Sequence, residues 1–111
     1  MATETQSPSE RRATPRVRAD VPVTWRAIHL DGRDADVDGR LLDVSDGGCC
    51  LQPAALPDPL GIGAVVEIDL RVQGRPVTRR GLVVADPRRD GRLHLAISTP
   101  SREPTLRALL G

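Results

Sequence analysis

The sequence predicts an all-β barrel with a short C-terminal helix. About six short segments alternate apolar and polar residues, and turn-forming glycine, proline and aspartate separate them at hairpin spacing. Near the C-terminus the apolar period changes from two residues to the helical spacing. At 111 residues the chain can build one modest core, so we expect a single folded domain.

The N-terminal part divides into a tail and an arm. Residues 1–9 are polar and lack apolar anchors, so we expect a disordered tail before a domain at residues 10–111. Residues 10–18, the arginine arm, carry four arginines, and Pro15 favours an extended conformation there. The N-terminus lacks the apolar core of a signal peptide, and no segment is long enough to span a membrane, so we expect a cytoplasmic protein.

The barrel is expected at about residues 20–99. Its predicted strands are residues 21–28, 39–44, 49–52, 64–73, 77–85 and 93–97. In the first strand Val21, Val23, Trp25 and Ala27 should share one face. The second and third strands should form a hairpin or sharp corner, because two glycines lie between them.

The predicted helix covers about residues 101–110. Ser101 can cap its N-terminus, and Leu106, Leu109 and Leu110 make one apolar stripe. A helix this short is unstable alone, so it must dock on the barrel, across an opening of the sheet.

Composition excludes broad nucleic-acid binding. The net charge is only +1, and Trp25 is the only aromatic residue, so neither a basic field nor a set of base-stacking rings is available. All 16 basic residues are arginine, whose planar guanidinium can bind phosphate bidentately and stack on a ring.

No pattern indicates an enzyme or a metal site. Residues 34–39 match the opening of a calcium-binding loop, but Ser45 stands where a bidentate glutamate is needed and the flanks are strands. His29 and His94 have no partner that makes a nucleophile–base pair, and His94 is expected as a half-exposed strand residue. The adjacent cysteines at 49–50 should be reduced. We therefore expect no catalytic residue, no metal and no cofactor.

The turn after the second strand is the more informative pattern. If Val44 points into the core, Asp43 and Ser45 project from the outer face. Gly47 and Gly48 permit positive φ and close approach of the backbone to a ligand. A carboxylate can accept from the N–H donors of a guanine, and an arginine fits the guanine O6 and N7. Alone, the same residues also fit ordinary turn chemistry.

Together with the arm, this turn resembles a known family. Residues 12–16 read Arg-Ala-Thr-Pro-Arg, and residues 43–48 read Asp-Val-Ser-Asp-Gly-Gly. The pair resembles the two-part signature of PilZ domains, Arg-x-x-x-Arg followed by Asp/Asn-x-Ser-x-x-Gly, and the resemblance covers about residues 10–99. It implies a six-stranded antiparallel barrel and a receptor for cyclic di-GMP, a bacterial second messenger.

The resemblance also implies roles for individual residues. Arg12 and Arg16 should bind phosphate and guanine, and Asp43 and Ser45 should contact a guanine edge. Gly48 should supply backbone clearance. We expect the arginine arm to order over the barrel when the ligand binds.

The resemblance leaves the role of Arg11, the last strand and the exact function undetermined. Arg11 precedes the motif, and in this family an arginine there often accompanies binding of a self-stacked ligand dimer. The last strand departs from the family pattern, with Ala96 in place of a glycine and residues 98–99 in place of an aromatic. The alternative function is a PilZ-like protein-interaction adaptor that binds no nucleotide. In either case the signal needs a downstream protein, which the sequence does not identify.

Overall fold

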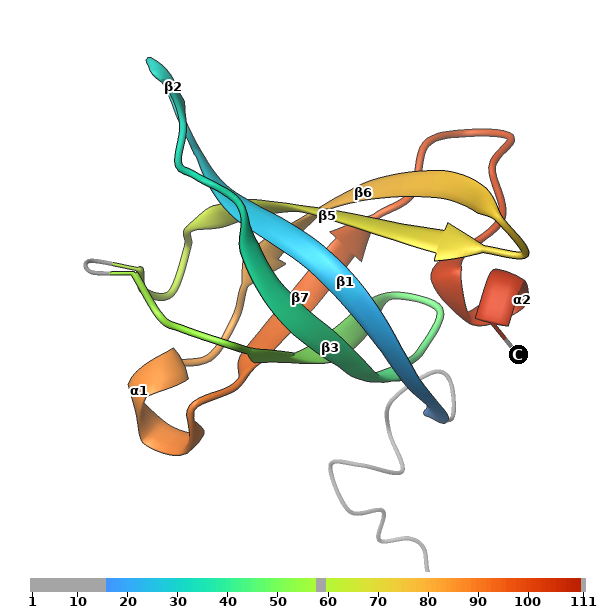
Figure 1. Cartoon of the computed structure of the whole chain (residues 1–111), viewed down its shortest axis with the longest axis horizontal. Helices are drawn as coiled ribbons and strands as arrows, with labels where there is room; N and C mark the ends of the chain where they lie inside the picture. The colour runs from blue at the N-terminus through green and yellow to red at the C-terminus, as the bar shows by residue number, and fades with distance from the viewer. Residues whose placement is uncertain (1–15, 58–59, 111) are drawn as a thin grey trace, which may run out of the picture.

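The computed structural model describes residues 16–57 and 60–110, and its fold is a closed six-stranded antiparallel β-barrel (Figure 1). The elements are β1 (Val17–His29), β2 (Gly32–Arg33), β3 (Val37–Val44), β4 (Gly48–Pro53), β5 (Val65–Val72), β6 (Arg75–Val83), α1 (Pro87–Asp90), β7 (Leu93–Ser98) and α2 (Leu106–Leu110). The six strands of the barrel are neighbours in the order β1-β3-β4-β7-β6-β5, and pairing of β1 with β5 closes it. Among the described strands, the two-residue strand β2 pairs only with the end of β1. The predicted fold class is confirmed. No helix in the described part is long and apolar enough to cross a membrane.

The inward faces of the strands form one apolar core. Val23, Trp25 and Ala27 are buried on β1, as the alternation predicts, and Trp25 has no exposed surface. Other strands contribute fully buried leucine, isoleucine and valine side chains. The barrel interior is therefore filled by side chains and does not form a ligand channel.

Strand β1 begins earlier than predicted and carries a bulge near its start. Its first residue is Val17, so the end of the arginine arm already belongs to the barrel. The pairing with β3 shifts between Arg18 and Val21, and Asp20 has a φ of 51°. Arg40 on β3 donates to the Asp20 side chain at 2.8 Å and to its carbonyl at 3.1 Å. These two hydrogen bonds stabilise the bulge. A bulge breaks the alternation of apolar and polar residues, so that alternation does not predict it.

The C-terminal helix starts at Leu106, so the prediction that it spans residues 101–110 is wrong at its N-terminus. Pro104 disfavours helical geometry at the preceding residue. Thr105, rather than Ser101, acts as the cap, because its Oγ1 accepts from the Ala108 N–H at 3.1 Å.

Helix α2 docks on the barrel as predicted, at one end (Figure 1). Leu106 is only 2% exposed and belongs to the core cluster. The segment before the helix is anchored by Arg79 of β6, which donates to the Pro104 carbonyl at 2.9 Å and pairs with Glu103 at 2.9 Å.

Helix α1 replaces a predicted turn. Asp86 accepts from the Arg88 N–H at 3.0 Å and caps the single helical turn. Gly91, with a φ of 73°, ends it by donating to the Pro87 carbonyl at 2.8 Å. Aspartate before proline and glycine after the turn are helix signals as well as turn signals, which explains the difference.

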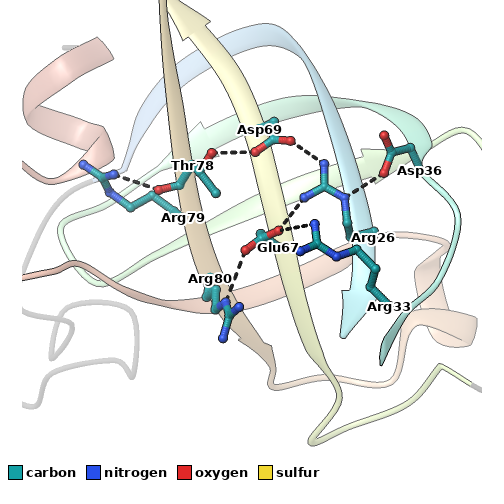
Figure 2. Close-up of polar contacts among 8 residues, drawn as sticks. All are labelled: Arg26, Arg33, Asp36, Glu67, Asp69, Thr78, Arg79 and Arg80. Atoms are coloured by element: carbon teal, nitrogen blue, oxygen red, sulfur yellow. Dashed lines mark hydrogen bonds and ion pairs between the residues drawn. The ribbon is translucent and has the colours of Figure 1, made fainter. Parts of the chain in front are cut away.

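A cluster of charged side chains lies on the outer wall where β1 meets β5 (Figure 2). Arg26 is 4% exposed and donates to Asp36 at 2.7 Å, to Glu67 at 2.6 Å and to Asp69. Burial opposes its charge, but the hydrogen bonds to Asp36 and Asp69 outweigh burial and raise the pKa of Arg26. The cluster ties the loop at residues 34–36 and β5 to β1, across the pairing that closes the barrel.

Candidate ligand-binding site

The two halves of the predicted motif meet at the start of β1. Arg16 lies immediately before β1 and donates from Nη1 to Asp43 Oδ1 at 2.5 Å, across 27 residues of sequence. The strand register brings them together, because Arg18 of β1 is the pairing partner of Asp43 on β3. The two side chains are 39% and 29% exposed, so both are accessible to a ligand. Arg11 and Arg12 lie outside the described residues.

The turn between β3 and β4 is held by its own backbone. The Ser45 N–H donates to the Gly48 carbonyl at 2.9 Å, and the Ser45 hydroxyl donates to the same oxygen at 3.4 Å. The Ile97 N–H of β7 donates to the Gly47 carbonyl at 2.9 Å. Ser45 therefore lies beside Asp43 at the rim of a fixed hairpin, as the sequence predicts.

The structure shows a constraint on Gly48 that the sequence did not indicate. Neither Gly47 nor Gly48 is among the described glycines with positive φ. A Cβ on Gly48 would instead lie 2.5 Å from the Leu95 carbonyl oxygen of β7, a distance that real Cβ atoms do not reach. Glycine at this position therefore lets β4 lie close to β7 in register below the turn, and its role in clearance for a ligand stays a prediction.

The strand pairing adds a residue that the sequence did not single out as functional. Asp43 of β3 pairs with Cys50 of β4, and Cys50 pairs with His94 of β7. His94 also hydrogen-bonds through Nε2 to Asp90 at 2.8 Å. This hydrogen bond lowers the pKa of Asp90, and a second hydrogen bond, from the Arg92 N–H, has a smaller effect in the same direction. The alternation of residues within β7 predicts only that His94 is half-exposed. Which residues lie beside it on other strands depends on the barrel register, which the local sequence does not show.

The two cysteines are free and lie on opposite sides of β4. Cys49 faces the core, where burial raises its pKa to about 12. Cys50 is 3% exposed, and burial and then the Asp43 carboxylate raise its pKa, while Arg92 and Arg16 act in the other direction. Both thiols are therefore neutral at pH 7, and Cys50 adds no charge beside Asp43.

The hairpin turn also contacts the C-terminal helix region. Asp46 accepts from the Thr105 hydroxyl and from the Arg107 guanidinium, both at 3.4 Å. These long contacts connect the rim of the candidate site to α2.

Other polar residues and a groove of the barrel lie elsewhere. The acidic loop is used within the protein, since Asp34 hydrogen-bonds His29 at 2.9 Å and Asp36 accepts from Arg26. A groove of about 960 Å³ is lined by β1 around Val23, the start of β3 and the end of β4, and includes none of the predicted ligand residues that the structure describes. The candidate site is instead a polar patch on the outer barrel wall.

The fold and the patch together define a small β-barrel binding module in which an arginine before the first strand meets a polar hairpin turn. The PilZ domain profile matches residues 10–111, so the chain belongs to the PilZ domain family, a family of cyclic di-GMP receptors and adaptors. The predicted family membership is confirmed.

A solved structure supports the same fold. The PilZ domain of CeSA from a cellulose-synthesizing bacterium superposes with a TM-score of 0.63 at 22% sequence identity, covering 78% of this chain and 83% of that chain. At this identity the likeness concerns the fold alone. No curated protein gives a significant match.

Proposed function

We propose that this protein is a receptor for cyclic di-GMP that passes the signal to another protein and carries out no catalysis itself. The observation that supports this most directly is the contact between Arg16 and Asp43. It brings together, on an accessible surface, the two motif halves that the family uses for this ligand.

The chemistry of the patch suits a ligand with two phosphates and two guanines. The Arg16 guanidinium can pair with phosphate and stack on a purine, and the Asp43 carboxylate can accept from the N–H groups of a guanine. A stacked arginine contributes about 0.5–2 kcal/mol, and a charge-assisted hydrogen bond about 1.5–3 kcal/mol. A few such contacts, less the cost of ordering the arm, give an affinity in the micromolar range, about −8 kcal/mol.

The ion pair itself prepares the site. Within the part of the chain that the structure describes, Arg16 has one carboxylate partner, Asp43, and both side chains remain partly exposed. When the ligand binds, its phosphate pairs with the Arg16 guanidinium and its guanine N–H groups donate to the Asp43 carboxylate. Each charged group therefore exchanges one partner for another. An exposed pair of this kind is worth at most about 1 kcal/mol, so exchanging it for the ligand costs little.

The arm delivers further arginines to the same place. Arg16 directly precedes β1 and contacts Asp43, so residues 10–15 are joined to the chain at this point of the barrel wall. In this proposal the ligand bridges Arg12 and Arg16 to the hairpin turn and orders the arm, and the ordered arm forms a new surface for the downstream protein. Arg11 binds the second copy of a self-stacked ligand dimer.

Isothermal titration with cyclic di-GMP tests the proposal. We expect micromolar binding by the wild type and at least about tenfold weaker binding by Arg16→Ala, the equivalent of one charge-assisted contact. Arg75→Ala is the matched control, because Arg75 is exposed at the start of β6, away from the motif. Absence of heat with the wild type, or undiminished affinity in Arg16→Ala, would contradict the proposal.

Two further readouts come from the same samples. A stoichiometry of two ligands per chain supports the role of Arg11, and one ligand per chain removes it. Hydrogen exchange on residues 10–18 separates the receptor from the nucleotide-free adaptor, because only a receptor's arm gains protection when the ligand is added.

A further inference from the structure

A row of outward-facing residues extends the candidate site across three strands. Asp43 on β3, Cys50 on β4 and His94 on β7 are successive pairing partners. His94 points outward, because its neighbours Leu93 and Leu95 are buried in the core. Two strand spacings separate Asp43 from His94, a distance of about 10 Å.

The residue between them forms a low, uncharged floor. Cys50 has a small side chain that is 3% exposed. Its thiol is neutral at pH 7, since burial and the Asp43 carboxylate raise its pKa. A ligand can therefore lie across β4 between Asp43 and His94. The neutral Cys50 thiol beneath it does not repel the ligand's phosphates.

The imidazole at the far end is already held in place. Its Nε2 hydrogen-bonds Asp90 at 2.8 Å, and the side chain is 32% exposed. Within the described part of the chain, its Nδ1 makes no hydrogen bond. The other rings on the described strands lie elsewhere, since Trp25 is fully buried and His29 lies at the end of β1 beside β2. The patch thus has one accessible ring, and its orientation is fixed before a ligand arrives.

We infer that His94, oriented by Asp90, is a ligand-binding residue that stacks on the second base of the dinucleotide while Arg16 and Asp43 hold the first. This inference rests on the proposed function, because it presupposes that cyclic di-GMP binds at this patch. It also gives a basis for selectivity, since a mononucleotide whose only base is held at Asp43 has no second base to stack on His94.

The second histidine of the chain provides an internal control. His29 hydrogen-bonds Asp34 at 2.9 Å, nearly the same geometry as His94 with Asp90, but at the end of β1 beside the β2 turn. In NMR spectra of the wild type, we expect cyclic di-GMP to shift the ring signals of His94 and to leave those of His29 in place. GMP should shift the His94 ring far less at equal occupancy.

Titration of three variants completes the test. His94→Ala should weaken cyclic di-GMP binding about tenfold, as expected for loss of one stacked base. His29→Ala should bind like the wild type, and His94→Phe, which keeps a ring, should stay within about threefold of the wild type. Circular dichroism checks that each variant is folded, which is expected because both histidines are partly exposed.

The possible failures can be told apart. If the wild type binds and Arg16→Ala weakens binding, but His94→Ala binds normally or the His94 signals do not move, the inference is wrong and the receptor function stands. Equal loss in His94→Ala and His94→Phe contradicts the stacking contact. If the wild type does not bind, both the receptor function and the inference fall.

Discussion

Strand β1 has an arginine–carboxylate contact just before its start, at Arg16, and another within it, at Arg26. The two contacts differ in burial and in the number of carboxylates involved. Arg26 is 4% exposed and is surrounded by Asp36, Glu67 and Asp69 (Figure 2). Arg16 is 39% exposed, and among residues 16–57 and 60–110 its one carboxylate partner is Asp43. The same side chain therefore closes the barrel in one place and remains available to a ligand in the other. Burial and the number of carboxylate partners separate the structural Arg26 from Arg16, for which we propose a role in binding.

Replacing Arg26 should have the largest effect on stability. Arg26→Met removes a buried charge and leaves Glu67, whose side chain is 12% exposed, without its shortest contact. Breaking a buried pair on one side costs about 3–5 kcal/mol, and we expect about 2–3 kcal/mol here because Asp36 and Asp69 can return to water. Urea denaturation measures this change.

The control for this variant is Arg33→Met. Arg33 contacts the same Glu67 at 3.4 Å but is 61% exposed, so its loss should change the free energy of unfolding by less than about 0.5 kcal/mol. Equal effects of the two substitutions would show that burial does not distinguish these arginines.

The glycine pair of the hairpin gives the next effect. Gly48→Ala places a Cβ 2.5 Å from the Leu95 carbonyl oxygen, and the strands must move apart to accept it. We expect a loss of about 1–3 kcal/mol in the free energy of unfolding, together with weaker ligand binding. Gly47→Ala is the matched control, because a Cβ there meets nothing within 4 Å and φ is not positive. Thermal unfolding that ranks the two variants equally would contradict this account.

The sequence predicted the features that depend on local pattern. Alternation located the strands, and the Asp43–Gly48 spacing located the turn, because both signals lie within a few neighbouring residues. The predicted helix start is too early, because Ser101 resembles a cap in sequence whereas Pro104 disfavours helical geometry just before the true start at Leu106.

Features that depend on the barrel register were beyond the sequence. Nothing local shows that Arg26 is covered by carboxylates from a loop and from β5. Likewise, His94 lies in the row of Asp43 only because β3, β4 and β7 are neighbours in the closed sheet. The same holds for Gly48, whose constraint comes from a strand more than forty residues away.

Replacing Arg16 should affect stability least and binding most, the reverse of Arg26. Its pair with Asp43 is exposed, so Arg16→Ala should change the free energy of unfolding by less than about 0.5 kcal/mol. Measuring urea denaturation on the titration samples gives both numbers for one variant. A large loss of stability in Arg16→Ala would mean that the contact is structural and that the comparison between the two arginines fails.

The smallest expected effect is a difference in acid sensitivity between the two arginine variants. Burial acts against ionisation of Asp69, but hydrogen bonds from Thr78 and Arg26 hold its pKa below the usual value. A carboxyl whose pKa is lowered by folding stabilises the protein above its unfolded pKa of about 3.9, and that contribution is lost as the pH falls through the lower folded value. The free energy of unfolding should therefore fall below about pH 4 in the wild type and in Arg16→Ala, and less steeply in Arg26→Met, where Asp69 keeps only the Thr78 bond. Urea midpoints measured from pH 6 to pH 3 on the three proteins test this, and parallel curves would show that Arg26 does not set the ionisation of Asp69.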